Sequence, residues 1–481
     1  MLDNLQNYVI GITFTGSFLI LLFKKYYRIL ALSFTLLGLV LISFLIPSVY
    51  QNQIFLYEKY FVDFFSIIFL ADGLSIFMAV VSSFIGCMIL IYILDYIRSN
   101  ENQYQYFFYF TLFIASMLGF VFSANLLLMY VFWEMIAIIF WRISGFYGDD
   151  EHLNASDKML YTTFLGSVFM LVGFALIYNE YNTLNILSLR GKEISLMAAF
   201  FIIAGLLSKS AQIPFYAWLP ENSRAIIPSL AILLAAEVGI YAFARLFLMT
   251  FSVPLMVFDT VIIISILTII ISGSLAFCEN DIKKILIYST IAQIGYIFLG
   301  LSTKSVIGFS AALLYIIVHG FGKAGLFLSV GIIERQTGIT DLRKLGGLSK
   351  IMPLVSIGFI LCALSIIGLP PFGGFFAKLL IIMSLVQQGR ILAASLAVVG
   401  AVFTLLYLFR LYNAVFLGTI KRNETELKTE LSPSNVTMHL EDKTTFEENK
   451  TMIIVVLIFG ILSLLLGLIL KLPLSFIEMI K

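Results

Sequence analysis

The sequence predicts an all-α polytopic membrane protein with about fourteen transmembrane helices. Of the 481 residues, 60% are hydrophobic and only 12% are charged, which is roughly half the charged fraction of a soluble domain. Apolar runs of about 20 residues, the length that crosses the hydrocarbon core, recur from one end of the chain to the other. Strand-like alternation does not accompany them, so a helical bundle is expected and an outer-membrane barrel is excluded.

The predicted spans have limits that are soft by a few residues. Basic residues follow the first span and no small-residue cleavage site does, so this span is expected to be retained and not removed as a signal peptide. Loops after odd-numbered spans hold about eighteen Lys and Arg and the remaining loops about six, which predicts a cell-membrane protein with both termini outside. The fourteen spans are 8–23, 29–49, 74–97, 104–121, 123–143, 159–179, 194–218, 225–250, 254–277, 283–301, 305–333, 351–383, 391–418 and 452–476.

Proline-containing breaks interrupt two of these spans and suggest a repeat. Pro214 and Pro220 interrupt the seventh span, and LPPFGG (369–374), with Pro370 and Pro371, interrupts the twelfth. Each break lies near the end of a five-span block, and two blocks with an odd number of spans have opposite orientations in the membrane. Paired breaks of this kind are typical of inverted-repeat transporters, where broken helices line a wet cavity buried in protein.

The predicted organisation has five parts. They are helices 1–3 (1–103), a first inverted repeat of helices 4–8 (104–250), a second of helices 9–13 (254–418), a polar cytoplasmic loop (420–450) and helix 14 (452–481).

Ionisable groups in the middle of spans are the candidate functional residues, because each costs at least ~2.5–3.5 kcal/mol at the bilayer centre. Lys209 lies deep in the seventh span beside the break, and Glu134 lies deep in the fifth. Desolvation and pairing act in opposite directions on the proton affinity of such groups. We therefore expect Glu134 and Lys209 to form a switchable proton site, with a static ion pair as the alternative.

Four further titratable residues continue this pattern. His319 and Lys323 are four residues apart and share one helix face, which favours a proton relay over an isolated core histidine. Glu237 lies about as deep in its span as Glu134, and Lys378 follows the second break as a counterpart of Lys209. Together the six residues predict a row of titratable groups through the middle of the bundle, an arrangement suited to protons.

Other charged and metal-ligating residues have simpler interpretations. Asp72 and Asp281 lie at the starts of spans, where helix N-termini favour carboxylates. The three cysteines have no paired spacing and only His319 lies within a span, which excludes an iron–sulfur cluster or a bis-histidine haem held by this chain alone. Arginines near span ends are expected to anchor at the interface; these are Arg98, Arg142, Arg245, Arg390 and Arg410.

Five motifs in fixed order resemble a known family, the antiporter-like membrane subunits. This family is shared by respiratory complex I (subunits of the M, N and L type), Mrp-type cation/proton antiporters (D-type subunits) and membrane-bound energy-converting hydrogenases. The resemblance covers roughly residues 60–418. The motifs are FWEM (132–135), SKSAQIPFYAWLPENS (208–223), ENDIKKILIYSTIAQIGYI (279–297), HGFGKAGLFL (319–328) and GLPPFGGFFAK (368–378).

The resemblance implies a role for each residue of the row. Glu134 and Lys209 become the input ion pair, His319 and Lys323 the central relay, and Lys378 the outlet or coupling lysine. It also implies fourteen helices with two inverted five-helix repeats, and no cofactor or metal on this chain.

One position departs from the family pattern. Glu237 stands where many members carry lysine, and Ala231 where many carry histidine. A carboxylate at position 237 could bind Na⁺, a hard cation that prefers oxygen ligands.

The sequence therefore predicts a subunit that translocates protons, or Na⁺, within a larger membrane complex. The first assembly is the membrane arm of a redox pump similar to complex I or a hydrogenase, whose partner subunits carry iron–sulfur clusters. The alternative is a non-redox Na⁺/H⁺ antiporter of the Mrp type. A stand-alone secondary carrier is a third class, disfavoured because no single clustered polar pocket is visible.

Overall fold

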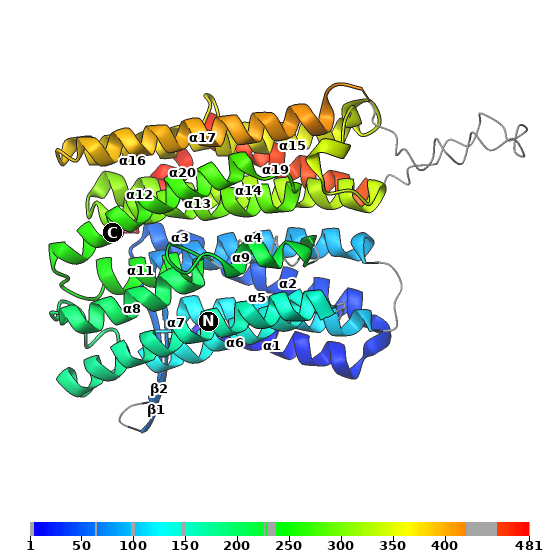
Figure 1. Cartoon of the computed structure of the whole chain (residues 1–481). Helices are drawn as coiled ribbons and strands as arrows, with labels where there is room; N and C mark the ends of the chain where they lie inside the picture. The colour runs from blue at the N-terminus through cyan, green and yellow to red at the C-terminus, as the bar shows by residue number, and fades with distance from the viewer. Residues whose placement is uncertain are drawn as a thin grey trace, which may run out of the picture.

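The protein is described by a computed structural model at residues 4–62, 65–97, 102–146, 150–225, 227–228, 237–419 and 450–480. Long helices lie nearly side by side, and a two-stranded hairpin runs across them and extends beyond one side of the bundle (Figure 1). The predicted polar loop falls almost entirely outside the described residues, as do Arg98 and Ala231. The longer helices are α1 (Leu5–Leu22), α2 (Tyr27–Ser43), α4 (Gly73–Tyr96), α5 (Gln103–Phe122), α6 (Leu126–Ser144), α7 (Asp150–Tyr181), α8 (Leu196–Lys209), α12 (Leu255–Cys278), α13 (Ile282–Ser302), α14 (Val306–Thr337), α15 (Pro353–Ile367), α16 (Gly373–Gln387), α17 (Ile391–Phe416) and α19 (Lys450–Leu468).

Shorter elements connect or end the long helices. Within the described ranges, eleven helices are long and apolar enough to cross a membrane, which confirms a helical polytopic membrane protein. The shorter elements are α3 (Ile46–Tyr50), α9 (Trp218–Glu221), α11 (Val238–Phe243), the π-helical turn η5 (Ala244–Leu248) and α20 (Lys471–Glu478).

Polar residues just outside the apolar runs start several of the helices. Asp72 accepts from the backbone N–H of Ser75 and caps α4, and Asp281 accepts from the N–H groups of Lys283 and Lys284 and caps α13. Asn125 caps α6 in the same way. The cap interpretation of Asp72 and Asp281 is therefore confirmed, although Asp72 has a second role described below.

A β-hairpin corrects the expectation that the chain contains no strands. Strands β1 (Phe55–Val62) and β2 (Phe65–Ala71) pair antiparallel. The backbone N–H of Ala124, in the turn between α5 and α6, donates to the Ile68 carbonyl at 2.8 Å and so ties β2 to the bundle. The sequence did not reveal β2 because its continuous apolar run is indistinguishable from the beginning of a span.

Two helices end in the middle of apolar segments. Helix α8 ends at Lys209, and residues 210–217, which contain Pro214, are not α-helical before α9 begins. Helix α15 ends at Ile367, where Gly368 has the left-handed conformation that favours glycine (φ 87°), and Pro370 and Pro371 precede α16. Pro220 lies inside the short helix α9, so the first interruption is centred on Pro214. Both breaks leave helix-end carbonyl groups that need partners.

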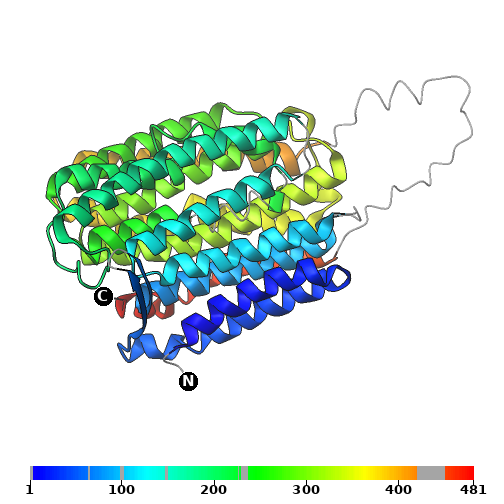
Figure 2. The same cartoon turned by 90° about the horizontal axis from the view of Figure 1, so that it is seen from below.

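Helix α14 lies at the centre of the second half of the bundle. It packs against α13, α15, α16 and α19, and it also contacts α4 from the first half. The N-terminal helices α1 and α2 lie along one edge of the molecule (Figure 2). The middle of α14, with His319 and Lys323, is consequently surrounded by protein on all sides.

Candidate functional site: a buried row of titratable side chains

Lys209 ends α8 and its ammonium group is held by α6. Its Nζ donates to the backbone carbonyl of Trp133 at 2.5 Å and lies 4.7 Å from the centroid of the Trp133 ring. The Trp133 ring is itself fixed, because its Nε1 donates to Ser167 Oγ at 2.9 Å. Trp218, beyond the break, donates to the Ser208 carbonyl at 3.0 Å and so satisfies one open group at the end of α8.

Glu134 is the neighbour of Lys209 but not its direct partner. No ion pair within 4.0 Å joins Glu134 and Lys209 among the ion pairs of the described residues. The Lys209 ammonium is directed instead at the carbonyl of the preceding residue, Trp133. Glu134 Oε1 is buried and accepts no hydrogen bond from the described part of the chain. The predicted direct ion pair is therefore absent from this conformation.

Glu237 and His319 form a buried pair. Glu237 Oε1 lies 3.0 Å from His319 Nδ1, and the two residues are 3% and 0% exposed. The other imidazole nitrogen, Nε2, is buried and has no hydrogen-bond partner within the described ranges. Sequence reasoning selected both residues, but the pairing joins positions 82 apart along the chain and has no local signal.

Lys323 and Lys378 lie on α14 and α16 and are both buried. Lys323 Nζ donates to Ser289 Oγ at 2.5 Å and to the Leu286 carbonyl at 3.2 Å. Lys378 Nζ donates to the Ile366 carbonyl at 2.8 Å, one of the groups left open where α15 ends. Lys378 also lies 4.9 Å from the centroid of the Tyr296 ring, a favourable cation–π distance.

Contacts between elements connect these residues into one row. Glu237 lies two residues before Gly239, which packs directly against Ser210 at the end of α8, and it pairs with His319 on α14. A hydrogen-bonded chain then continues from Lys323 toward Lys378. All five basic or acidic members from Lys209 to Lys378 are at most 6% exposed.

Sequence reasoning missed the uncharged members of the row. The spacing of polar residues in α13 could have indicated three of them. Ser289, Gln293 and Tyr296 are four and three residues apart and so share one helix face. The missed residues are Trp133, Ser289, Gln293, Tyr296, Tyr315 and Tyr407.

Arg245 is a correction to the sequence analysis, which placed it at the membrane interface. It is 3% exposed, and its two terminal nitrogens donate to the two carboxylate oxygens of Asp72 at 2.6 and 2.7 Å. Its Nε also donates to Tyr241 Oη at 3.1 Å. This bidentate arrangement satisfies both charges and locks the start of α4 to η5.

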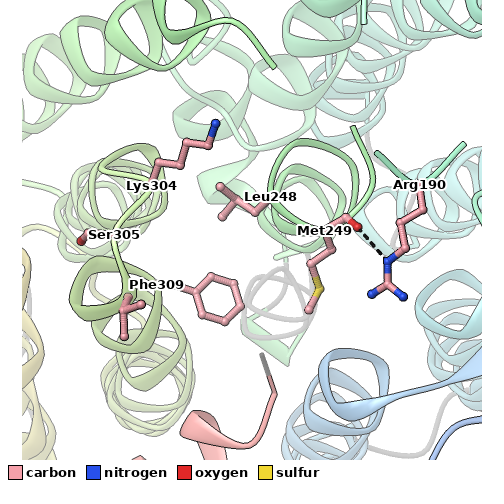
Figure 3. Close-up of a pocket in the computed structure, with 7 residues that line it drawn as sticks. Arg190, Leu248, Met249, Lys304, Ser305 and Phe309 are labelled. Atoms are coloured by element: carbon pink, nitrogen blue, oxygen red, sulfur yellow. Dashed lines mark hydrogen bonds between the residues drawn. The ribbon is translucent and has the colours of Figure 1, made fainter. Parts of the chain in front are cut away.

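An open cavity of about 360 Å³ lies at the ends of helices, apart from the row. Figure 3 shows Arg190 and Lys304 on opposite sides of Leu248 and Met249, with Arg190 Nε donating to the Met249 carbonyl at 3.4 Å. None of the six predicted site residues lines this cavity, whose walls are formed by Arg190, Leu248, Met249, Lys304, Ser305, Val306 and Phe309.

No cluster of three or more His, Cys, Asp or Glu side chains that could hold a metal ion occurs among the described residues. Glu237 faces an imidazole nitrogen. The row is therefore chemically equipped to bind and exchange protons.

Comparison with known proteins assigns the fold and the family. The family model for NADH:quinone oxidoreductase/Mrp antiporter transmembrane proteins matches residues 123–404. The chain is 33% identical over 445 residues to NADH-quinone oxidoreductase subunit L of Buchnera aphidicola, covering 85% of this chain and 70% of that protein. It is 30% identical over 427 residues to the D-type subunit of the Na⁺/H⁺ antiporter of Alkalihalophilus pseudofirmus, covering 85% and 86%. The match to antiporter subunit A1 of Staphylococcus haemolyticus covers only 48% of the length of that protein.

Solved structures share the fold along the whole chain. A chain of the Mrp complex from Dietzia sp. superposes with a TM-score of 0.88 at 24% identity, covering 100% of this chain and 96% of that one. A chain of the membrane-bound sulfane sulfur reductase, an archaeal respiratory membrane complex, superposes with a TM-score of 0.83 at 21% identity, covering 98% and 96%.

The buried Arg245–Asp72 pair generates a stability prediction. Asp72→Asn keeps the helix cap but leaves the arginine without a countercharge, so we expect a loss of about 3–5 kcal/mol. The double variant Asp72→Asn with Arg245→Met removes both charges and should be more stable than Asp72→Asn alone. Thermal unfolding of the purified chain in detergent measures both effects.

The exposed Asp341–Arg343 pair supplies the matched control. The side-chain hydrogen bond from Arg343 lowers the pKa of Asp341 to about 2, yet Arg343 is 72% exposed and solvent screens the pair. Asp341→Asn should therefore leave the unfolding temperature nearly unchanged. An Asp72→Asn variant as stable as the Asp341→Asn control would contradict the structural role of the buried pair.

Proposed function

We propose that this chain, which belongs to the family of NADH:quinone oxidoreductase and Mrp antiporter transmembrane subunits, translocates protons along its buried row. The observation that carries the proposal is the burial of five titratable side chains on elements that pack against one another. Lys209 lies on α8, Glu237 directly before α11, His319 and Lys323 on α14 and Lys378 on α16. Placing so many ionisable groups there is costly, and membrane proteins place them mainly along ion and proton pathways.

The chemistry of the row suits stepwise proton movement. The Lys209 ammonium contacts a backbone carbonyl and an aromatic ring. Because neither of these groups carries a charge, the release of a proton from Lys209 does not require an ion pair with a carboxylate to break. The Glu237–His319 pair can accept a proton, because the His319 Nε2 has no other partner within the described ranges. Lys323, one turn further along α14, is the next acceptor, and Lys378 beside the second break is the outlet.

We further infer fourteen spans in two inverted repeats. Beyond the eleven long helices, three segments complete the set: α8 with α9, the segment that ends in α11 and η5, and α15 with α16. The repeats extend over 104–250 and 254–418, each with one break and one lysine beside it, flanked by helices 1–3 (1–103) and helix 14 (452–481), with 420–450 as a cytoplasmic loop. With fourteen spans both termini lie on the same side, and the distribution of basic residues places that side outside.

Two assemblies are candidates for the partner subunits. The 33% identity to a subunit L favours the membrane arm of a redox-driven complex, in which partner subunits carry the redox centres. The nearly complete mutual coverage with a D-type antiporter subunit favours a non-redox Na⁺/H⁺ antiporter. In either complex this chain supplies the ion path and other membrane subunits surround it.

The visible absorption of the gently purified complex separates these assemblies. Iron–sulfur absorbance in subunits that co-purify with this chain selects the redox-driven complex. An assembled complex without that absorbance selects the antiporter.

Lys209 provides the test of the proposed function. In the intact complex reconstituted into vesicles, Lys209→Ala should reduce proton translocation at least tenfold, because it removes the first proton carrier of the row. Assembly should be retained, since replacing a buried lysine by a neutral residue relieves a desolvation cost. The control is Lys158→Ala, because the Lys158 side chain is 64% exposed in a surface pair with Glu221. Proton flux in Lys209→Ala equal to that in the control would refute the proposal.

Variants of Glu237 distinguish a role in proton transfer from a role in Na⁺ binding. Because Glu237 faces the His319 imidazole, we expect Glu237→Gln to slow proton flux several-fold without raising the sodium requirement. Glu237→Lys should be more severe, since a cation against His319 in low dielectric repels the neighbouring basic groups. Proton-dependent and sodium-dependent flux are measured for both variants. An increased sodium requirement in Glu237→Gln would identify Glu237 as a Na⁺ ligand instead.

A further inference from the structure

A hydrogen-bonded chain of uncharged side chains begins at Lys323. Lys323 Nζ donates to Ser289 Oγ at 2.5 Å, and Ser289 Oγ lies 2.7 Å from Tyr407 Oη. Gln293 Nε2 donates to the same Tyr407 Oη at 3.1 Å. These contacts run from α14 through α13 to α17 and back, and all four side chains are buried.

The chain ends against Lys378. The Tyr315 hydroxyl donates to Gln293 Oε1, and the Tyr315 ring centroid lies 5.8 Å from Lys378 Nζ. Lys378 meets the face of this ring and not its hydroxyl group. Four side chains therefore lie between Lys323 and Lys378, in the order Ser289, Tyr407, Gln293 and Tyr315.

The orientation of the Gln293 amide follows from its neighbours. Thr404 donates its only hydroxyl hydrogen to the Gly400 carbonyl at 3.0 Å, so toward Gln293 it can only accept. Gln293 Nε2 lies 3.2 Å from Thr404 Oγ1 and supplies that hydrogen bond. The amide nitrogen is therefore directed at Thr404 and Tyr407, the amide oxygen faces Tyr315, and Tyr315 must be the donor.

This orientation has a consequence for proton movement. A hydroxyl group can accept one proton while it releases another, so Ser289, Tyr407 and Tyr315 can each take part in a relay. A neutral amide has an acceptor only at oxygen and donors only at nitrogen, and it does not exchange one for the other without forming its imidic tautomer. The hydrogen-bonded chain is therefore continuous in geometry from Lys323 to the Tyr315 hydroxyl, but it is interrupted for protons at Gln293.

We propose that Gln293 blocks proton transfer along the hydrogen-bonded chain between Lys323 and Lys378. Its hydrogen bonds to Tyr407 and Tyr315 position their hydroxyl groups, while its amide prevents a proton from passing along the hydrogen-bonded chain toward Lys378. The proposal rests on the function proposed above, because a coupled ion path needs a barrier that opens only during turnover. Gln293 and Tyr407 act through other groups and are positioning residues.

The decisive variant is Gln293→Glu. A protonated glutamate has the shape of glutamine and keeps an acceptor for Tyr315 and a donor for Tyr407, but its carboxyl group can accept a proton at one oxygen and release one from the other. Gln293→Met, of similar size, removes the hydrogen bonds and cannot titrate. Gln293→His is the second titratable variant, for use if the glutamate variant does not assemble.

The experiment uses the intact complex in vesicles of phosphatidylethanolamine and phosphatidylglycerol. Passive proton entry after a pH jump, without any driving reaction or ion gradient, is followed with an enclosed pH-sensitive dye, and driven transport is measured in the same preparation. We expect Gln293→Glu to raise the passive leak at least tenfold over the parent. Gln293→Met and Tyr407→Phe should keep the leak within about twofold of the parent while lowering driven transport several-fold.

The outcomes separate the two proposals. An assembled Gln293→Glu or Gln293→His complex with no added leak, or a Gln293→Met leak as large as that of Gln293→Glu, overturns the insulating role. A parent complex that translocates no protons under a driving force overturns the proposed function instead.

Discussion

The cost of placing charge inside the membrane is the constraint on which the rest of the structure depends. An ammonium group in the bilayer interior must find acceptors, and each carbonyl within an intact helix already accepts one backbone hydrogen bond. The break after α15 removes this difficulty, because Ile366 and Ile367 end a helix and their carbonyls both accept from Lys378. Gly368, with its left-handed backbone, makes that ending possible. The break and the lysine are thus one structural unit.

Two kinds of buried charge occur in this chain, and their contacts distinguish them. Asp72 and Arg245 satisfy one another through two short hydrogen bonds, an arrangement that resists any change of protonation state. The lysines of the row have weaker, neutral partners: carbonyls, hydroxyl groups and aromatic rings. A neutral partner does not fix the charge of the group that it contacts. Asp72 and Arg245 are therefore held in their charged forms by full pairing, whereas the contacts of these lysines are compatible with the proposed change of charge.

The sequence was sufficient for the helical membrane class and for choosing the titratable residues, because depth within an apolar run is a local property. The sequence was insufficient for predicting which side chains these residues contact. Glu237 meets His319, and Arg245 meets Asp72, only through tertiary packing of helices far apart in sequence. Arg245 was misplaced because its position near a span end is equally consistent with anchoring at the interface. Strand β2 was missed because its apolar residues have no period that separates a buried strand from a helix.

The separation of Lys323 from Lys378 explains why polar residues without charge are concentrated between them. Two ammonium groups in one low-dielectric region repel each other unless dipoles lie between them. Ser289, Tyr407, Gln293 and Tyr315 supply such dipoles, and the ring faces of Tyr296 and Tyr315 supply further negative potential beside Lys378. Ordered dipoles of this kind stabilise charge at each end without carrying it between the ends. The same side chains can therefore allow Lys323 and Lys378 to be protonated in turn without a direct proton transfer between the two lysines.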